Sequence, residues 1–287
     1  MSGKTSAYKT LNGKTMFSLS GKTALVTGGR GLYGSVISEG LAEAGAHVII
    51  ASRDRNACET LAKKINADVN AAADDVSGSI ENASPGCAEG AELDLGSDAS
   101  INTMAGYIEG KFGGVDILVN NAVTREHYGG LENAGRDTLL ESLDINLAGI
   151  VMLTKALISG IMERRGSIIN IGSIQGVMGP HFPYYENGQT SPLGYTMEKW
   201  GMVGFTKWMA AYYGKSGVRV NCLSPGGYDP GLETTRPEFY ARYAEHTPLG
   251  KWPDRDDIKG PVIFFASDAS RYVTGVNLLM DGGFTIW

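Results

Sequence analysis

The chain has 287 residues, 43% of them hydrophobic, and a chain of this length buries on the order of 75% of its unfolded surface when it folds. Its 25 basic and 31 acidic residues give a net charge of −6 with no long run of either sign, which argues against the clustered Lys and Arg of a nucleic-acid-binding protein. Charged residues make up 20% of the chain and are spread too evenly to leave about 20 consecutive apolar residues, so we expect no membrane partner either.

The N-terminal residues 1–19 are polar and lack the apolar core of a secretion signal. We therefore expect a tail followed by one domain over residues 20–287, in a cytoplasmic protein. The three cysteines Cys58, Cys87 and Cys222 are unevenly spaced and form no C-x-x-C pair. Neither a disulfide framework nor a metal site is predicted.

Short apolar runs alternate with longer amphipathic segments along the chain, a pattern typical of parallel strands covered on both faces by helices. The predicted strands are Thr23–Thr27, Ala46–Ala51, Ala91–Leu95, Val115–Val119, Ser167–Ile171, Val218–Leu223 and Val276–Met280. The predicted helices are Gly34–Ala44, Arg55–Ile65, Asp98–Phe112, a long one from about Arg136 to Met162, and Leu193–Tyr213. This order predicts an α/β fold with a Rossmann-like, doubly wound, parallel seven-stranded sheet in a single domain.

Three segments interrupt the alternation. The polar segment Asn66–Gly90 is rich in Gly, Ser and Ala, and we interpret it as an extended surface loop. Two long segments follow the fifth and sixth strands, at about 176–192 and 227–247. Because such folds bind ligands at the carboxyl ends of their strands, we expect these two segments to form the substrate loops.

A glycine-rich loop follows the first strand and precedes a helix, in the sequence Thr27-Gly28-Gly29-Arg30-Gly31-Leu32-Tyr33-Gly34. Glycines permit a tight turn and let a pyrophosphate approach backbone N–H groups at a helix N-terminus, where the helix dipole favours anions. A turn in a glycine-rich chain would look similar, but the flanking strand and helix favour dinucleotide binding. The predicted contacts from this loop are Gly28, Arg30, Gly31, Leu32, Tyr33 and Gly34.

The second strand ends in Ser52-Arg53-Asp54, about 20 residues past the glycine loop. Dinucleotide folds usually present here the side chain that distinguishes NAD from NADP. A carboxylate in place of Ser52 would repel a 2′-phosphate, whereas a hydroxyl beside the Arg53 guanidinium would hold it. Arg30 adds a second positive charge. NADP is therefore predicted as the cofactor, with NAD as the alternative if Arg53 only pairs with Asp54 or solvates the strand end.

Tyr195 and Lys199 lie four residues apart in a predicted helix, so both side chains are on one face within one turn. An adjacent ammonium stabilises a phenolate, which makes the phenol usable as a general acid or base. An exposed Tyr/Lys pair would arise by chance in many helices. Ser173 favours the catalytic interpretation of the pair. It directly follows Gly172, which comes after the strand Ser167–Ile171.

Several motifs then occur in one order along the chain. After the glycine loop come Asn120-Asn121-Ala122, Asn146, Ser173, Tyr195 with Lys199, Pro225-Gly226, and Asp281-Gly282-Gly283. Over nearly all of residues 20–287 this order resembles the compact single-domain branch of the short-chain dehydrogenase/reductase superfamily. The resemblance implies an NAD(P)-dependent oxidoreductase that assembles as a homodimer or homotetramer.

The resemblance also implies roles for individual residues. Tyr195 would be the acid/base, Ser173 would hold the reacting oxygen, Lys199 would bind the nicotinamide ribose, and Asn146 would join a proton relay through water. The cofactor contacts implied beyond the glycine loop, Ser52 and Arg53 are Asp94, Leu95, Asn121, Ala122, Tyr195, Lys199, Pro225, Gly226 and Tyr228.

The chain departs from the usual pattern of this branch at several positions. Leu32 stands where the middle glycine of the loop belongs, as in the epimerase-like branch, and Val123 replaces the Gly of Asn-Asn-Ala-Gly. No Thr follows Pro225-Gly226 at the usual place. Ser173 and Tyr195 are 22 positions apart instead of about a dozen, which predicts an insertion at 176–192.

The predicted reaction is the interconversion of a secondary alcohol and a ketone by hydride transfer. The alternatives are an epimerase or dehydratase with tightly held cofactor, and a non-catalytic NADP-binding sensor. Polar and aromatic residues in the expected substrate loops favour a sugar, polyol or sugar acid as the small-molecule substrate, in a loose likeness to gluconate 5-dehydrogenases. The predicted substrate contacts are Arg125, Gln175, His181 and Tyr185, with Arg125 and His181 binding a carboxylate.

Overall fold

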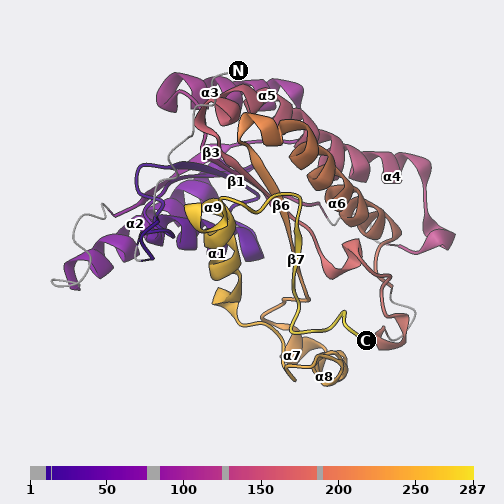
Figure 1. The fold of residues 1–287 in the computed structure, drawn as a ribbon. Coiled ribbons are helices and arrows are strands. Elements are labelled where there is room, and N and C mark those ends of the chain that lie inside the picture. The colour runs from indigo at the N-terminus through magenta and orange to yellow at the C-terminus, as the bar shows by residue number, and fades with distance from the viewer. Residues whose placement is uncertain (1–10, 14, 76–84, 125–128, 186–189) are drawn as a thin grey trace, which may run out of the picture.

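The residues that the computed structural model describes, 11–13, 15–75, 85–124, 129–185 and 190–287, contain one parallel sheet of seven strands in the order β3-β2-β1-β4-β5-β6-β7 (Figure 1). The strands are β1 (Thr23–Thr27), β2 (His47–Ser52), β3 (Cys87–Glu92), β4 (Ile117–Asn120), β5 (Ser167–Ile171), β6 (Arg219–Pro225) and β7 (Asn277–Met280). The order reverses between β1 and β4, which is where doubly wound folds bind ligands. The predicted fold class is confirmed.

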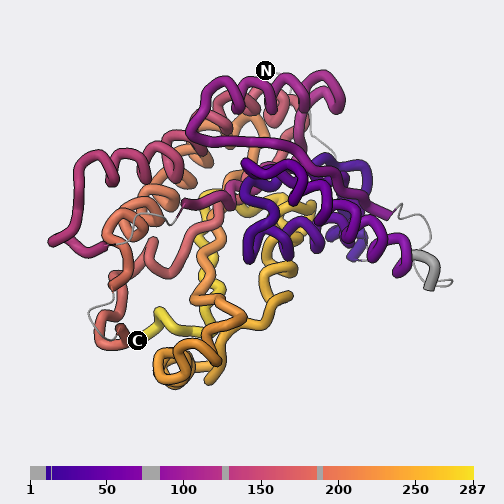
Figure 2. Tube along the Cα trace, turned by 180° about the vertical axis from the view of Figure 1, so that it is seen from behind, coloured from indigo at the N-terminus to yellow at the C-terminus, as the bar shows by residue number. Residues whose placement is uncertain are grey.

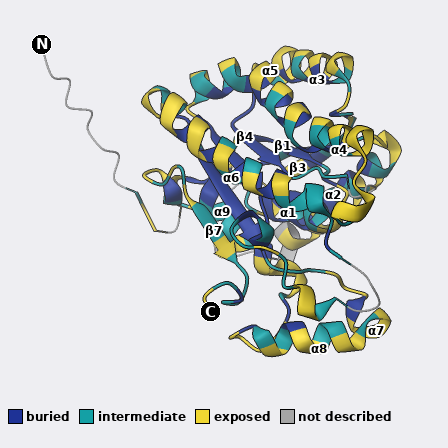
Figure 3. Ribbon diagram, turned by 90° about the vertical axis from the view of Figure 1, so that its right-hand side faces the viewer, coloured by how far each residue is buried: buried dark blue, intermediate teal, exposed yellow. Residues whose placement is uncertain are grey.

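Helices cover both faces of the sheet, and the buried strands lie between them (Figure 3). One face packs against α1 (Leu32–Glu43), α2 (Arg55–Asp75) and α9 (Lys259–Ala266). The other packs against α3 (Asp98–Phe112), α5 (Gly149–Arg164) and α6 (Leu193–Tyr213). The core consists of Val, Ile and Leu from the strands and of the inward faces of these helices.

The prediction at the β3 edge was wrong. The sequence predicts a loop over Asn66–Gly90 and a strand over Ala91–Leu95, but α2 continues to Asp75 and β3 occupies Cys87–Glu92. This edge strand pairs only with β2 and is not fully buried, so it has no continuous apolar run for the hydrophobic pattern to detect. The Asn66 side chain fixes it by donating to the carbonyl of Ala88 at 2.9 Å and accepting from its N–H at 2.7 Å.

The long helix predicted from about Arg136 to Met162 is divided in the structure. It consists of α4 (Arg136–Leu143), a π-helical turn at Asp144–Ala148, and α5. The spacing of apolar residues does not show where one π-helical turn is inserted into a helix. Such π turns often occur at functional positions. Within the described residues, Arg136–Arg164 is also long and apolar enough by composition to cross a membrane, a stretch that the sequence analysis did not anticipate. However, its residues Leu153, Leu157 and Ile161 are buried in the core.

The segments after β5 and β6 extend beyond the sheet and come together. The second contains α7 (Leu232–Thr235) and α8 (Pro237–His246), which form a small lobe near the C-terminus (Figure 2). Buried aromatic residues of this lobe pack with Ile174 and Phe284 in a separate cluster. At the other end of the domain Leu19, placed in the tail by the sequence analysis, is buried and donates its N–H to the Ala44 carbonyl at 2.8 Å.

Candidate active site

A cavity of about 990 Å³ lies at the carboxyl ends of the strands and extends into the α7–α8 lobe. It brings together most of the residues that the sequence singles out. Its lining includes Gly28, Arg30, Gly31, Leu32, Tyr33, Ser52, Arg53, Asp94, Leu95, Asn121, Ala122, Ser173, Gln175, His181, Tyr185, Tyr195, Lys199, Pro225, Gly226 and Tyr228. Gly34 and Asn146 lie outside this lining. Arg125 lies outside the described residues.

The glycine loop is held in place by the end of β4. The Asn121 amide donates to the carbonyls of Thr27 and Gly28 at 3.0 and 3.1 Å, and the Thr27 hydroxyl accepts from the backbone N–H groups of Asn121 and Ala122 at 3.0 Å each. A side chain at Gly34 would put its Cβ 2.1 Å from the Gly28 carbonyl oxygen, so this close turn requires glycine. Asn121 therefore shapes the loop, which presents the N-terminus of α1 to the cavity.

The end of the cavity beside β2 is basic. Arg30 and Arg53 both line it and are solvent-exposed. The Ser52 hydroxyl lies 3.3 Å from the N–H of Asp54 and 3.0 Å from the Cys58 thiol, so it stabilises the turn after β2. The two guanidinium groups, next to the Asp54 carboxylate that also lines this end, are the candidates for binding an anion here.

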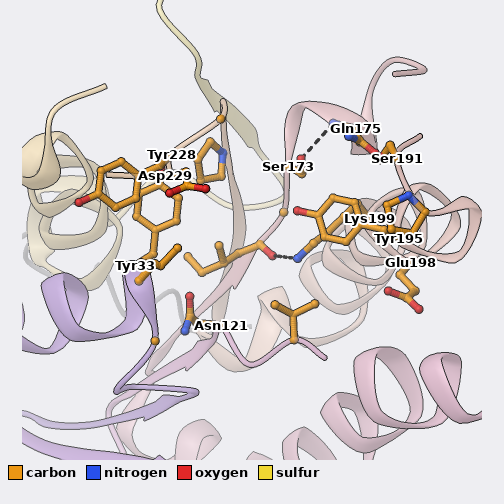
Figure 4. Close-up of a pocket in the computed structure, with 18 of the residues that line it drawn as sticks. Tyr33, Asn121, Ser173, Gln175, Ser191, Tyr195, Glu198, Lys199, Tyr228 and Asp229 are labelled. Carbon is orange, nitrogen blue, oxygen red and sulfur yellow. Dashed lines mark hydrogen bonds between the residues drawn. The ribbon is translucent and has the colours of Figure 1, made fainter. Parts of the chain in front are cut away.

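The opposite wall carries the predicted catalytic residues. Lys199, on α6, is buried and donates from Nζ to the carbonyl of Ile171 at 2.8 Å, and Nζ lies 5.4 Å from the centre of the Tyr195 ring. Ser173 is the N-cap of the short 3₁₀ helix Ile174–Gly176, where its hydroxyl accepts from the Gln175 N–H at 3.2 Å. The Ser173 and Tyr195 side chains face the same part of the cavity (Figure 4).

A buried carboxylate next to this wall was missed by the sequence analysis. Glu198 is only 2% exposed, and its carboxylate accepts from Ser142 at 2.5 Å and from the Asn146 amide at 2.8 Å. Asn146 also bonds the backbone of Thr124 in both directions, at 2.8 and 3.1 Å. The network ties α6 to the π turn at Asp144–Ala148. In the sequence, this network is indicated only by the position of Glu198, a charged residue directly before Lys199 in a mostly apolar helix.

The far end of the cavity is walled by aromatic side chains. The residues that line it are Tyr185, Phe239, Tyr243, Trp252 and Phe284. Ring centres are 4.1 to 6.3 Å apart in the pairs Tyr185–Phe239, Phe239–Tyr243, Tyr243–Trp252 and Tyr243–Phe284. The Gln175 side-chain oxygen accepts from the hydroxyls of Ser191 and Thr196 at 2.7 and 3.0 Å. Polar groups and aromatic faces thus occur together here, as a hydroxylated ligand requires.

Two tyrosines meet across the cavity beside the glycine loop. Tyr33 and Tyr228 stack with ring centres 4.9 Å apart and planes 25° apart (Figure 4). Burial raises the pKa of the Tyr33 phenol, with nearby Tyr243 and Tyr228 adding to the rise. The phenol is therefore neutral at physiological pH and acts as an apolar wall of the site.

Comparison with known proteins identifies what the whole chain is similar to. A family model described as "Enoyl-(Acyl carrier protein) reductase" matches residues 31–285. The chain is 32% identical over 268 residues to the 3-oxoacyl-(acyl-carrier-protein) reductase FabG of Vibrio cholerae, covering 92% of this chain and 98% of that protein. It is 33% identical over 267 residues to the trans-4-hydroxycyclohexanecarboxylate dehydrogenase of Sinomonas cyclohexanicum, covering 92% of this chain and 93% of that protein.

A solved structure shows the same architecture. The chain is similar, with a TM-score of 0.79 and 30% identity, to the crystal structure of a gluconate 5-dehydrogenase from Burkholderia cenocepacia J2315 in complex with NADP and tartrate. The match covers 95% of this chain and 98% of that one.

Replacing Glu198 with Ala should lower the free energy of unfolding by on the order of 1 to 3 kcal/mol, because two buried donors lose their acceptor. Glu198→Gln should lie between this variant and the wild type, since a carboxamide keeps one of the two acceptor oxygens. Urea unfolding of the two variants measures both effects. Glu238→Ala, at an exposed glutamate of α8, is the control; an equal loss there, or no loss in Glu198→Ala, contradicts the network.

Proposed function

Because the chain belongs to the short-chain dehydrogenase/reductase superfamily, we propose that it is an NADP-dependent oxidoreductase that interconverts a secondary alcohol and a ketone. One observation carries this proposal: Ser173, Tyr195 and Lys199 line a single cavity that also contains the glycine loop. A non-catalytic NADP sensor would not need all three side chains there. An epimerase or dehydratase remains the alternative within enzymes, and it would release no reduced cofactor when supplied with an alcohol.

The residues around the cavity fit a dinucleotide phosphate. The first turn of α1 has N–H groups without helical partners and contains no acidic side chain, so it favours a pyrophosphate. Arg30 and Arg53 would bind the 2′-phosphate, and Asp94 and Leu95 line the adjoining part of the cavity, where the adenosine would lie. Pro225, Gly226 and Tyr228 would lie at the nicotinamide. When bound, NADP(H) supplies or accepts the hydride.

The protein residues then handle the proton. In ketone reduction Tyr195 would donate its phenolic proton to the substrate oxygen, and in alcohol oxidation it would accept that proton. Ser173 would bond the same oxygen and fix its position. The Lys199 ammonium, oriented by the Ile171 carbonyl, would stabilise the phenolate of Tyr195. The water-mediated relay through Asn146 stays a prediction.

The substrate in this proposal is a small hydroxylated compound: a sugar, polyol or sugar acid. The support is the mixture of Gln175, His181, Ser191 and Tyr185 with aromatic rings at the far end of the cavity. A hydrocarbon chain would be matched by a lining with few donors and acceptors.

The proposal includes self-association, since α6 presents large apolar side chains to solvent. Trp200, Trp208 and Tyr212 are 52%, 58% and 66% exposed, and the last two stack on each other. Exposed apolar surface of this kind is typical of protein interfaces. We expect sedimentation velocity to show a dimer or tetramer that Trp208→Glu dissociates; a monomeric wild type would rule this out.

The variant Tyr195→Phe should reduce kcat by about 10² to 10⁴, because it removes the transferable proton. The Kd for NADP should change little, since the glycine loop, Arg30 and Arg53 are untouched. Steady-state kinetics and cofactor fluorescence titration measure the two quantities. Tyr272→Phe, at a fully exposed tyrosine, is the control, and retention of wild-type turnover in Tyr195→Phe would refute the assignment.

Arg53→Ala should weaken NADP binding by on the order of 10- to 100-fold while leaving NAD binding nearly unchanged, because only NADP carries the 2′-phosphate. Isothermal titration with both cofactors measures this difference. Arg55→Ala is the matched control, since Arg55 pairs with Glu59 and does not line the cavity. Equal losses of affinity for both cofactors would mean that Arg53 does not bind the 2′-phosphate.

A further inference from the structure

The basic side chains of the cavity lie in three places. Arg30 and Arg53 line the end beside β2, and Lys199 lies in the middle, next to Tyr195. Arg236 joins α7 to α8 and lines the cavity with the aromatic residues of the far end. The proposed function assigns no role to Arg236.

The position of Arg236 is fixed by its surroundings. Its backbone N–H donates to the Leu232 carbonyl at 2.8 Å, and its guanidinium carbon lies 4.4 Å from the centre of the Phe239 ring. Among the described residues, no carboxylate lies within ion-pair distance of it. A guanidinium stacked on an aromatic face keeps its N–H edge available for a planar anion such as a carboxylate.

Tyr185 connects Arg236 to the reaction centre. Its ring lies 5.5 Å from that of Phe239, on which the guanidinium stacks. Burial raises the pKa of the Tyr185 phenol, and nearby Tyr195 raises it further. Hydrogen bonding to Ser191 and the positive charge of Arg236 lower this pKa and so oppose the rise. Tyr185, Arg236 and Tyr195 all line the same cavity.

Of the acidic residues in the segment 227–247, Asp229 lines the cavity, whereas Glu233, Glu238 and Glu245 do not. Asp229 lies beside Tyr228, on the side of the cavity near the glycine loop, and accepts from the Gly231 N–H at 3.1 Å (Figure 4). Among the described residues that line it, the far end thus combines the Arg236 guanidinium, the His181 imidazole, several hydroxyl and amide groups and an aromatic wall.

We propose that Arg236 binds the carboxylate of the substrate, so that the enzyme acts on a compact hydroxy acid and its keto acid. A substrate of this class would place its carboxylate on the guanidinium edge and its reacting hydroxyl at Ser173 and Tyr195. The hydroxylated carbon chain between them would pack against Tyr185. This proposal rests on the proposed function and assigns the anion-binding role to Arg236, a residue to which the sequence analysis gave no function.

A binding experiment tests the proposal without turnover. Tartrate and threitol share the same hydroxylated carbon chain, but only tartrate carries carboxylates. With NADPH saturating, so that neither alcohol can be oxidised, calorimetry should show tighter binding of tartrate than of threitol by the wild type. Arg236→Gln should weaken tartrate binding by about 10- to 100-fold and leave threitol unchanged, because a charge-assisted pair is lost. Arg236→Lys should recover part of the loss.

Arg242→Gln is the matched control, because Arg242 lies on α8, which begins directly after Arg236, pairs with Glu238 and does not line the cavity. It should leave both affinities unchanged. Three results would overturn the proposal: equal binding of tartrate and threitol by the wild type, no effect of Arg236→Gln on tartrate, or an equal loss for both ligands.

Turnover separates failure of this proposal from failure of the proposed function. Hydroxy acids, neutral polyols and 3-oxoacyl thioesters would be assayed with NADP or NADPH in the wild type and in Arg236→Gln. The expected result is a loss of kcat/KM confined to the acids. Efficient turnover of polyols or thioesters that Arg236→Gln leaves unchanged would refute the carboxylate assignment alone. Absence of any redox turnover would refute the proposed function.

Discussion

The hydrogen bond from the Lys199 ammonium to the Ile171 carbonyl is the contact around which the site is organised. A buried ammonium requires an acceptor, and this one fixes α6 against the carboxyl end of β5. The placement of its neighbours follows: Tyr195 lies one helical turn earlier, and Ser173 comes two residues after Ile171. Glu198, directly before Lys199, also lines the cavity and holds the π turn through Asn146. One helix thus supplies the cavity with its proposed acid/base and supports the wall behind it.

The sequence predicts those parts of the molecule that local chemistry determines. The central strands are continuous apolar runs because they are buried on both faces. Tyr195 and Lys199 are recognised by their helical spacing together with Ser173 and the order of the other motifs. In contrast, β3 is a polar edge strand whose pairing depends on Asn66 of α2, and the π turn leaves the hydrophobic period almost unchanged. The burial of Glu198 depends on donors from another helix, some 50 residues away. Arg236 lies in a segment with no motif, so only the fold shows that it faces the cavity.

The two halves of the cavity are constrained by different physics. On the cofactor side, the glycine loop packs closely against other backbone atoms. A Cβ at Gly34 would overlap the backbone of Gly28, and a Cβ at Gly28 would overlap the backbone of Ala122, so few residue types fit at these two positions. On the far side, the wall is made of side chains from two long segments that touch mainly through aromatic rings, including His181 against His246. The relatives reported above carry different substrate names: a 3-oxoacyl-(acyl-carrier-protein) reductase, a trans-4-hydroxycyclohexanecarboxylate dehydrogenase and a gluconate 5-dehydrogenase.

The attachment of the α7–α8 lobe shows how such variation leaves the chemistry intact. The Tyr243 phenol accepts from the Gly227 N–H at 2.7 Å, just beyond the end of β6, and its ring lies 4.1 Å from that of Trp252. Burial raises the pKa of Tyr243 to about 12, so it stays neutral and joins the lobe to the sheet as an uncharged hydrogen-bonding group. Ser173, Tyr195 and Lys199 are all held by β5 and α6, outside this lobe. Substitutions around Arg236 are therefore expected to change the far wall without displacing Ser173, Tyr195 and Lys199, the groups proposed to handle the proton.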